Sequence, residues 1–516
     1  MTSSLTDTRP GSTSDGAPGQ VRSIGHWLSG AEVRGRSGRT HPVTDPATGE
    51  VTGHVDLADP DEVDDVVNAA AAAGAAWGRL SLGRRTKVLF RFRELLESRA
   101  EEVAAVITAE HGKVLSDALG EVSRGLEVVE FACGLPHLLK GEANENVSTR
   151  VDIRSLRQPL GVVAVITPFN FPAMVPLWFV PVALAAGNAV ILKPSERDPS
   201  ASLLLARMWE EAGLPAGVLS VLNGDVTTVN ALLDHPGVAA ASFVGSTPVA
   251  KAVYERGTAA GKRVQALGGA KNHMVVLPDA DLDLAADAAV NAGFGSAGER
   301  CMAISAVVAV GGVADALVDK IAERARGLRT GDGRRGCDMG PLVTAQHRDR
   351  VRGYVDAGEA AGARLVVDGR DPEVDGARDG FWLGPTLFDH VTPDMTIYTD
   401  EIFGPVLSVV RVESFDDALA LVNANPYGNG TAIFTNDGGA SRRYSEEVEV
   451  GMVGVNVPIP IPMAYYSFGG WKASLFGDSH AHGLDGFRFY TRTKVVTTRW
   501  LDPSHAGLDL GFPTTS

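Results

Sequence analysis

The sequence predicts an α/β protein whose parallel sheets are covered by helices on both faces. Continuous apolar stretches have the composition of fully buried strands: Val162–Ile166, Ala189–Leu192, Leu219–Leu222 and Ala239–Val244. Helical patterns separate these stretches, at about residues 173–186, 200–212 and 227–233. Unbroken apolar strands that alternate with helices are typical of parallel sheets. A similar alternation from residue 303 to about Val455 predicts a second unit of the same class.

The first 140 residues are predicted to be mainly helical. Residues 45–49 have the composition of a turn between two short strands. A helix is then predicted to begin at Asp59 and Pro60, because Asp is a favoured N-cap and Pro fits the first turn. Further helical patterns follow at about residues 83–98, 101–112 and 117–132.

Composition restricts the class of protein and its location. The chain has 516 residues and a formal net charge of -16, so neither nucleic acid nor anionic lipid is an expected partner. Residues 1–20 predict a disordered tail without a signal peptide, and the longest apolar run, at 174–187, is too short to cross a membrane. Three cysteines predict no disulfide framework and fit a reducing compartment. We therefore expect a cytoplasmic protein, and the sequence has no zinc-type Cys/His spacing.

The stretch Gly293-Phe-Gly-Ser-Ala-Gly-Glu-Arg-Cys301 joins a predicted helix to a predicted strand. Its glycines allow unusual conformations and close backbone contacts. Arg300 adjoins Cys301, and a neighbouring cation favours the thiolate, which is the nucleophilic form of a thiol. The alternative is a buried, unreactive cysteine. The glycine spacing imitates a dinucleotide fingerprint, but that motif follows a strand and opens a helix, so we do not interpret it as a phosphate loop.

Polar loops follow the predicted strands of the first sheet, at residues 167–170, 193–196, 223–225 and 245–247. Because the carboxyl ends of parallel strands meet at one edge of a sheet, these loops predict a dinucleotide site. Near the other end of the chain, residues 487–500 alternate like a strand. Such a strand needs a sheet to join, and pairing with another subunit is the expected solution.

Several motifs, together covering nearly the whole chain after residue 20, resemble those of the NAD(P)-dependent aldehyde dehydrogenase superfamily. They are Pro168-Phe-Asn-Phe-Pro172, Lys193-Pro-Ser-Glu196, Phe243-Val-Gly-Ser-Thr247, Leu267-Gly-Gly269, the Cys301 turn and Glu401-Ile-Phe-Gly-Pro405. Within the superfamily the chain is similar to the CoA-acylating methylmalonate-semialdehyde dehydrogenases. That similarity is carried by Gly298-Glu-Arg-Cys-Met302, Ala270-Lys-Asn-His273, Val455-Asn-Val-Pro-Ile-Pro460 and Ser467-Phe-Gly-Gly-Trp-Lys472.

The resemblance implies a domain organisation and an assembly. A Rossmann-like NAD-binding domain is expected at 21–146 and 160–275, with an α/β catalytic domain at 276–465. A small β oligomerisation arm and C-terminal tail are expected at 147–159 and 466–505. The expected assembly is a homotetramer built as a dimer of dimers, and a simple dimer is the alternative.

The resemblance also assigns roles to individual residues. Cys301 would attack an aldehyde carbon, and the Asn170 amide and the Cys301 backbone N–H would hold the oxyanion. Hydride transfer to NAD would leave an acyl thioester on Cys301. The residues expected to contact the cofactor are Thr167, Phe169, Lys193, Glu196, Arg197, Ser246, Gly268, Glu401 and Phe403. Glu196 favours NAD over NADP, because an acid beside the ribose would repel a 2′-phosphate.

Ala266 marks the departure from the hydrolytic members of the family. Those members carry a glutamate before Leu-Gly-Gly, which activates the water that cleaves the thioester. A methyl group cannot take a proton, so the thioester is expected to persist until the thiol of coenzyme A attacks it. The alternative is a hydrolytic aldehyde dehydrogenase that recruits another base, such as Glu299.

Arg124 and Arg300 are the expected partners of the substrate's own carboxylate, because guanidinium groups form charge-assisted hydrogen bonds with carboxylates. For Arg300, thiolate activation or a structural ion pair is the alternative. A carboxylate β to the thioester carbonyl can leave as carbon dioxide, so methylmalonate semialdehyde would give propionyl-CoA and malonate semialdehyde acetyl-CoA. The sequence leaves open which semialdehyde is preferred, and whether the pathway is valine, inositol or β-alanine breakdown.

Overall fold

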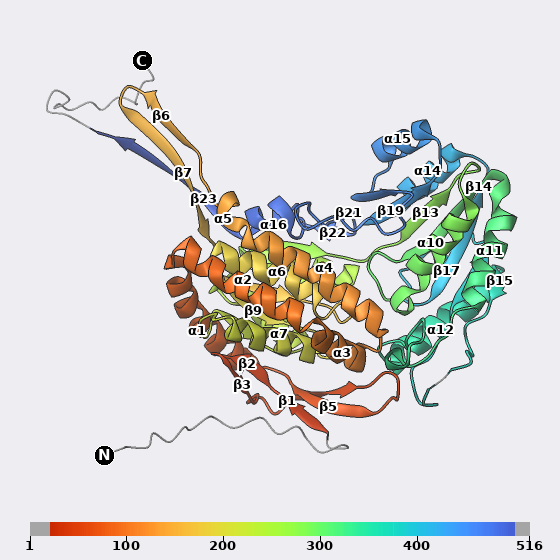
Figure 1. Cartoon of the computed structure of the whole chain (residues 1–516), viewed down its shortest axis with the longest axis horizontal. Helices are drawn as coiled ribbons and strands as arrows, with labels where there is room; N and C mark the ends of the chain where they lie inside the picture. The colour runs from red at the N-terminus through yellow and green to blue at the C-terminus, as the bar shows by residue number, and fades with distance from the viewer. Residues whose placement is uncertain (1–20, 375, 501–516) are drawn as a thin grey trace.

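The computed structural model describes residues 21–374 and 376–500, so the tail predicted at 1–20 and residues 501–505 lie outside the described residues. Within them, two large sheets with helices on both faces lie side by side, and a narrow β arm extends from the first (Figure 1). Both sheets are mainly parallel, which confirms the predicted fold class. No helix among the described residues is long and apolar enough to span a membrane.

The first sheet has the strand order β22-β12-β11-β8-β9-β10-β2-β3. Its strands are β22 (Leu475–Phe476), β12 (Arg263–Leu267), β11 (Val238–Val244), β8 (Val162–Ile166), β9 (Ala189–Lys193), β10 (Leu219–Val221), β2 (His26–Leu28) and β3 (Ala31–Val33). The strands from β12 to β10 are parallel, and β22, β2 and β3 add antiparallel edges. The sequence predicted β8, β9, β10 and β11 to within one residue at each end, because strands buried on both faces are continuously apolar.

Helices cover both faces of this sheet. One face packs against α1 (Pro60–Arg79), α8 (Val226–Asp234) and α9 (Thr247–Ala259), and their apolar side chains share one core cluster with every second residue of β8. The other face packs against α2 (Leu82–Ser98), α3 (Ala100–His111), α4 (Leu115–Cys133), α6 (Met174–Ala186) and α7 (Ser200–Glu211). The intervening residues of β8, such as Val163 and Val165, point into that second cluster. The strand is therefore apolar on both sides because both sides are covered.

Local sequence sets the helix ends near the site. The helix α1 begins as predicted, with a capping box in which Asp59 and Glu62 each accept a backbone N–H of the other, and with Pro60 in the first turn. The helix α3 stops at Gly112, whose φ of 90° is left-handed. A Cβ at Gly112 would also lie 2.7 Å from Pro341 Cγ, so glycine is required there both for conformation and for space.

The second sheet has the strand order β15-β16-β17-β14-β13-β19-β20. Its strands are β15 (Arg364–Val367), β16 (Thr386–Asp389), β17 (Val406–Val412), β14 (Ile304–Val310), β13 (Asn272–Val276), β19 (Gly430–Phe434) and β20 (Met452–Val455). Helices α10 (Leu282–Phe294), α11 (Ala314–Arg326) and α12 (Ala345–Ala360) contribute to the core on one face, and α14 (Phe415–Ala424) and α15 (Gly438–Glu447) to the core on the other. Because β13 pairs with β14 and β19, the second unit begins at Asn272, a few residues before the boundary expected after 275.

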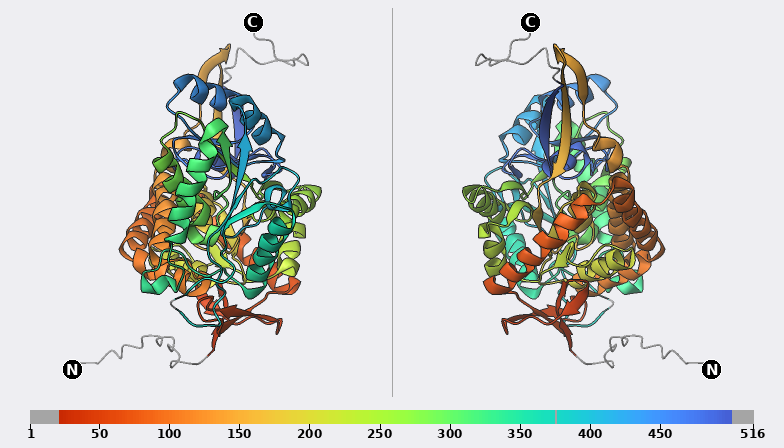
Figure 2. Two further views of the ribbon diagram at one scale, coloured as in Figure 1. Left: turned by 90° about the vertical axis from the view of Figure 1, so that its right-hand side faces the viewer. Right: turned by 90° about the vertical axis from the view of Figure 1, so that its left-hand side faces the viewer.

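The arm consists of β6 (Ala143–Ser148), β7 (Val151–Pro159) and β23 (Thr491–Arg499), and it projects from the body in the side views as well (Figure 2). The strand β23 pairs with β7 of its own chain along its whole length, so it joins a sheet, as expected, but within its own chain. Residues 487–489, expected to extend this strand, lie in the helix α16 (Gly483–Phe489). The reason is burial, because Phe487, Phe489 and the following Tyr490 pack into the core of the first unit.

Two boundaries of the expected arm also differ from the structure. The hairpin begins at Ala143 rather than 147. Between residues 466 and 490 the chain packs on the body: β22 joins the first sheet, and β21 (Trp471–Lys472) pairs with β18 (Tyr427–Gly428). The short elements that complete the fold are β1 (Arg22–Ile24), β4 (Thr40–Thr44), β5 (Val51–Asp56), α5 (Leu135–Leu138) and α13 (Thr396–Thr399).

Candidate active site

A cavity of about 930 Å³ lies between the two units, at the carboxyl ends of the strands of the first sheet. Loops that follow β8, β9, β11 and β12 line one side of it, and the Cys301 turn and the 400–403 loop line the other. It collects most of the residues expected at the site: Thr167, Phe169, Asn170, Lys193, Glu196, Arg197, Ser246, Gly268, Cys301, Glu401 and Phe403. A ligand in this cavity would contact both units.

The turn that presents Cys301 has an unusual backbone. Ser296, Ala297 and Gly298 have φ values of 53°, 52° and 73°, all in the left-handed region. A Cβ at Gly298 would lie 2.2 Å from the backbone oxygen of Gly404, so the turn packs directly against the loop that carries Glu401. The backbone oxygen of Cys301 accepts hydrogen bonds from Asn272 Nδ2 at 2.9 Å and Asn429 Nδ2 at 3.1 Å. These contacts hold the backbone of Cys301 in place just before the strand β14.

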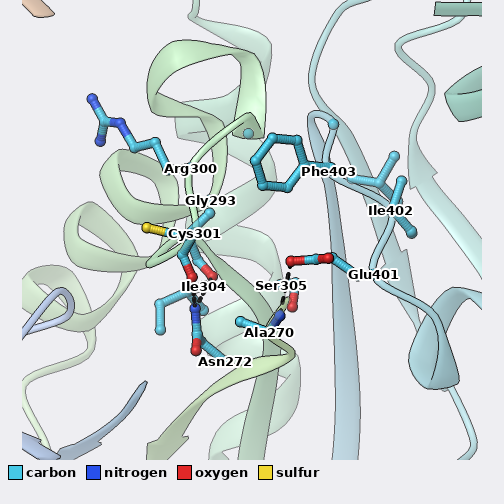
Figure 3. Close-up of a pocket in the computed structure, with 14 residues that line it drawn as sticks. Ala270, Asn272, Gly293, Arg300, Cys301, Ile304, Ser305, Glu401, Ile402 and Phe403 are labelled. Atoms are coloured by element: carbon cyan, nitrogen blue, oxygen red, sulfur yellow. Dashed lines mark hydrogen bonds between the residues drawn. The ribbon is translucent and has the colours of Figure 1, made fainter. Parts of the chain in front are cut away.

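Cys301 is partly exposed, and it lines both the large cavity and a smaller recess, whose residues are drawn in Figure 3. Burial raises the pKa of the thiol to about 12, and the carboxylate of Glu401 adds to the shift. Arg300 opposes the shift only weakly. The neighbouring arginine therefore does not bring the pKa of the thiol below its usual value in this structure.

Asn170 is buried and lies against the turn that carries the cysteine. Its Nδ2 donates to the backbone oxygen of Glu299, two residues before Cys301, at 3.0 Å. A carboxamide nitrogen has two N–H groups, so the second is suited to a ligand oxygen in the cavity that Asn170 and Cys301 both line. This arrangement is suited to stabilising negative charge on an oxygen next to the sulfur.

The 400–405 loop brings an acid and an aromatic ring from the second unit to the first. Glu401 Oε1 accepts the backbone N–H of Ala270 at 2.8 Å, and burial raises the pKa of its carboxyl to about 7. Phe403 has a φ of 61°, and its ring meets that of Phe169 edge-on with centroids 5.9 Å apart. A Cβ at Gly269 would lie 2.3 Å from Glu401 Oε2, so that glycine makes room for the carboxylate.

Charged groups occupy the end of the cavity near β9. Lys193 Nζ lies 3.3 Å from Glu196 Oε2. Burial alone would raise the pKa of Glu196, but Lys193, a backbone hydrogen bond and Arg197 together outweigh burial and lower the pKa, so the group is an anion at neutral pH. The guanidinium of Arg197 lies over the ring of Phe169, 5.0 Å from its centroid. This end of the cavity therefore offers a carboxylate acceptor beside two cations.

One wall of the cavity is provided by α12 and was not predicted from the sequence. His347, Arg350 and Tyr354 project from this helix at a spacing of three and four residues, so they share one face of it. His347 Nε2 lies 2.7 Å from the backbone oxygen of Phe403, and Tyr354 donates to Asp400 at 2.9 Å. The spacing was visible in the sequence, but nothing in it indicated that this face meets the first unit.

Arg124 and Arg300 are not among the residues that line the large cavity. Arg300 lines the recess beside Cys301 and pairs with Asp117 of α4. Arg124 Nη1 lies 2.9 Å from Glu127 Oε1, and its Nη2 donates to the backbone oxygen of Pro462 at 2.9 Å. Each guanidinium thus has its own protein partner in this structure. For Arg300 that partner makes a structural ion pair, which was one of the alternatives to its expected role in binding the substrate carboxylate.

Ala266 and Glu299 are the two positions at which a general base for hydrolysis could lie near the Cys301 sulfur. Ala266 is fully buried in an apolar cluster, and its neighbours across the sheet are Phe243 and Phe476. Glu299 is also fully buried and does not line the cavity. Its Oε1 accepts the backbone N–H of Val343 at 3.3 Å, and burial raises the pKa of its carboxyl to about 8. Glu299 is therefore poorly placed to activate water at Cys301.

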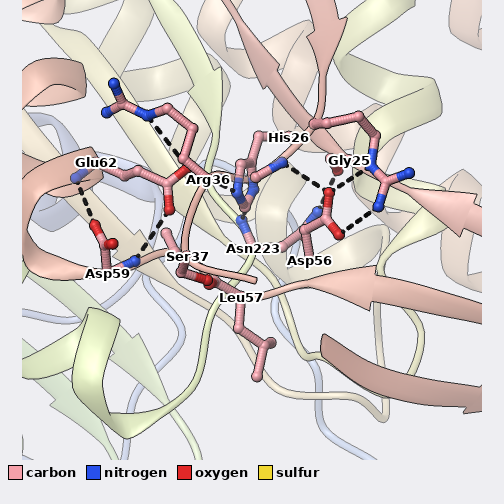
Figure 4. Close-up of polar contacts among 12 residues, drawn as sticks. Gly25, His26, Arg36, Ser37, Asp56, Leu57, Asp59, Glu62 and Asn223 are labelled. Atoms are coloured by element: carbon pink, nitrogen blue, oxygen red, sulfur yellow. Dashed lines mark hydrogen bonds and ion pairs between the residues drawn. The ribbon is translucent and has the colours of Figure 1, made fainter. Parts of the chain in front are cut away.

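Asn223, in a loop expected to contact a ligand, serves the fold instead. Its Nδ2 donates to the backbone oxygen of Gly25 at 2.6 Å, and its backbone N–H donates to His26 Nδ1 at 3.1 Å (Figure 4). These bonds tie the end of β10 to the N-terminal strands. Asp225 from the same loop does line the cavity, and it also pairs with Arg39.

The comparisons with known proteins all point to the same family. The model of the aldehyde dehydrogenase family matches residues 33–496. A malonate-semialdehyde dehydrogenase from Pseudomonas aeruginosa is 56% identical over 492 residues, which cover 95% of this chain and 99% of that protein. Malonate-semialdehyde dehydrogenase 2 from Geobacillus kaustophilus is 49% identical over 482 residues, covering 93% of this chain and 99% of that protein.

Solved structures agree with these matches. A crystal structure in complex with NAD, from Sinorhizobium meliloti 1021 and described as a methylmalonate-semialdehyde dehydrogenase, is 51% identical with a TM-score of 0.93. It covers 94% of this chain, which in turn covers 99% of it. A methylmalonate-semialdehyde dehydrogenase from Oceanimonas doudoroffii is 52% identical with a TM-score of 0.92, again covering 94% of this chain and 99% of that one.

Proposed function

The chain belongs to the aldehyde dehydrogenase family, and from that premise we propose that it oxidises methylmalonate or malonate semialdehyde with NAD and passes the acyl group to coenzyme A. The products would be propionyl-CoA or acetyl-CoA, carbon dioxide and NADH. One observation carries the choice of coenzyme A over water. Cys301 opens into the cavity while the position that would hold a hydrolytic base is Ala266, buried among apolar side chains.

The oxidation step would depend on two groups of this chain. The Cys301 sulfur, as thiolate, forms a bond to the aldehyde carbon, and the carbonyl π electrons move to the oxygen. The Asn170 amide and the Cys301 backbone N–H hold the resulting oxyanion, a stabilisation worth about 10²- to 10³-fold in rate for one donor. NAD, when bound, supplies the acceptor for the hydride that leaves this carbon. The acyl group then remains on Cys301 as a thioester.

The second half-reaction releases the acyl group. The thiol of coenzyme A loses its proton, its sulfur bonds to the acyl carbon, and the Cys301 sulfur leaves as thiolate. The carboxylate β to the thioester carbonyl leaves as carbon dioxide, its bonding electrons pass into the carbonyl, and a proton is taken up at the α carbon. Water as a competing nucleophile would lack a base, a loss of roughly 10²- to 10⁴-fold.

The residues of the cavity suit NAD. The hydroxyl of Thr167 lines the cavity and is buried without a hydrogen-bond partner among the described residues. Ser246, also in the cavity, precedes α9 as its N-cap, and backbone N–H groups at a helix start suit a pyrophosphate. The anionic Glu196 suits ribose hydroxyls and opposes a 2′-phosphate, which supports NAD over NADP. Glu401 and Phe403 would hold the nicotinamide end.

The substrate carboxylate would bind to Arg300 and Arg124, as the family resemblance implies. Arg300 adjoins the nucleophile and lines its recess, which supports this role. Its pairing with Asp117 means that a substrate carboxylate would share or displace that partner. Arg124 would likewise act from the edge of the site, where backbone oxygens of residues 461 and 462 now accept its hydrogen bonds.

The test is the dependence of turnover on coenzyme A. We expect one equivalent of NADH per active site without coenzyme A, and continued NADH and acyl-CoA formation after its addition. Cys301→Ala should abolish both phases. Continued turnover without coenzyme A, with release of free acid, would overturn the proposal and favour a hydrolytic dehydrogenase. That alternative has little support, because Glu299 does not line the cavity.

We also propose that the chain works in the cytoplasm as a homotetramer. Free Cys133, Cys301 and Cys337 suit a reducing compartment. The arm leaves one apolar side chain on each of its three strands exposed, Val147, Leu156 and Val495, at 42%, 37% and 62%, and these side chains and the open strand edge suit burial against a second copy. Light scattering of the purified chain tests the assembly, and a monomer would contradict it.

A further inference from the structure

A lysine and a glutamate form an ion pair wholly inside the first unit, directly behind the loop that carries Asn170. Lys113 Nζ lies 2.8 Å from Glu121 Oε2, and neither side chain has any exposed surface. The same Nζ donates to the backbone oxygen of Asn170 at 2.6 Å. It also lies over the ring of Phe171, 4.3 Å from the centroid. One ammonium group thus contacts two successive residues of the loop.

Glu121 holds the other end of the same loop. Its Oε1 accepts the backbone N–H groups of Ala173 and Met174, at 2.8 and 3.0 Å, at the start of α6. The pair therefore fixes the chain from residue 170 to residue 174 by its backbone. On the opposite side, the Asn170 amide donates to Glu299 in the turn that leads to Cys301. Lys113 therefore holds the backbone oxygen of Asn170, and Glu299 in the cysteine turn holds its side-chain amide.

The surrounding backbone is built tightly around Lys113. A Cβ at Gly333 would lie 2.6 Å from the Lys113 backbone oxygen, and a Cβ at Gly340 would lie 2.1 Å from that of Gly112. These contacts hold the backbone from which the Lys113 side chain extends, and the ammonium group itself is held by Glu121 and by the Asn170 carbonyl. The hydrogen bond from Lys113 Nζ thus links the Asn170 carbonyl to a tightly packed segment of backbone.

Stability alone is a weak reason for such a pair. Removing two charges from water costs free energy that their attraction often does not repay, and apolar replacements of similar volume are frequently neutral or stabilising. A site that stabilises a developing oxyanion, by contrast, needs its donors fixed before the reaction begins, because a displacement of about 1 Å can cost roughly 10²-fold in rate. The location of the pair fits the second purpose.

We propose that Lys113, together with Glu121, is a positioning residue that aims the Asn170 amide at the oxygen of the substrate's aldehyde. This inference rests on the proposed function, in which Asn170 is an oxyanion donor. Lys113 does not itself touch the substrate. It acts by holding the backbone oxygen of Asn170, which fixes the direction of the side chain.

The test measures the first turnover of NADH with methylmalonate semialdehyde in two variants. Lys113→Met removes the donor but leaves the Glu121 charge buried. Lys113→Met with Glu121→Gln removes both charges and keeps an amide oxygen for the N–H groups of Ala173 and Met174. We expect both variants to lose about 10²-fold in the first-turnover rate constant with little change in KM. Alkylation of Cys301 by iodoacetamide, which forms no oxyanion, should keep the wild-type rate.

A double-mutant cycle with Asn170→Ala separates positioning from general damage. If Lys113 acts through the Asn170 amide, Lys113→Met/Glu121→Gln should add almost nothing to the loss caused by Asn170→Ala. Equal losses in both backgrounds, a wild-type rate in the neutral double variant, or failure of that variant to fold would each overturn the inference. Failure of the proposed function would look different, since the wild-type chain would give no NADH or Asn170→Ala would be harmless.

Discussion

The contact between Gly298 and Gly404 gives a prediction with a matched control. In Gly298→Ala, the new Cβ would lie 2.2 Å from the Gly404 oxygen and 2.5 Å from its carbonyl carbon. Gly261 has almost the same φ, 74° against 73°, but a Cβ there meets nothing within 4 Å. A left-handed alanine costs about 1 to 2 kcal/mol in either position. The overpacking at residue 298 adds about 1 to 3 kcal/mol.

The larger effect is expected on catalysis, because the contact joins the Cys301 turn to the loop that carries Glu401. Gly298→Ala should lower the first-turnover rate by about 10²-fold or more, whereas Gly261→Ala should keep the wild-type rate. Thermal unfolding under identical conditions should rank the variants as wild type, Gly261→Ala and Gly298→Ala, in order of falling transition temperature. Equal activity in the two variants would refute the idea that this close contact aligns the site.

Three further predictions concern the nucleophile, the missing base and the cofactor. Ala266→Glu should raise NADH turnover without coenzyme A by roughly 10²- to 10⁴-fold, while Ala266→Gln should not, and equal rates for the two would contradict the role given to this position. Without NAD, alkylation of Cys301 should accelerate as the pH rises from 7 to 10 and reach no plateau, because the raised pKa of about 12 keeps the thiol protonated. NAD should shift this pH profile to lower pH, because oxidised nicotinamide is cationic. A plateau near pH 8.5 without NAD would contradict the conclusion that burial raises the pKa of the thiol. Glu196→Gln should raise the ratio of kcat/KM for NADP to kcat/KM for NAD at least about tenfold. The reason is that the Glu196 carboxylate and the 2′-phosphate of NADP, as like charges near a protein surface, repel by about 1 to 4 kcal/mol. An unchanged ratio would mean that the 2′-hydroxyl of NAD does not bind beside Glu196.

Much of the fold was predictable because it follows from local patterns. The strands of the first sheet are buried on both faces, so their apolar stretches mark their ends closely, as β8 shows. The loops that line the cavity were predictable for a similar reason, since parallel strands deliver their carboxyl ends to one edge. Family motifs identified individual residues in those loops, and Cys301, Asn170 and Glu401 do meet in one cavity.

The features that sequence did not predict depend on contacts between distant segments. Residues 487–489 alternate like a strand, but burial of the aromatic side chains against the first unit makes them helical. The α12 residues became part of the site only because the second unit brings that helix to the cavity. The ion pair of Arg300 with Asp117, and the burial that raises the pKa of Cys301, likewise require the packed structure.

The most direct test of the central claim follows the fate of the acyl group on Cys301. The purified chain is mixed with NAD and methylmalonate semialdehyde in the absence of coenzyme A, quenched, and its intact mass is measured. The proposal predicts one equivalent of NADH and a stable acyl adduct that Cys301→Ala cannot form, discharged as acyl-CoA when coenzyme A is added. Steady NADH formation with free acid and no adduct would contradict it.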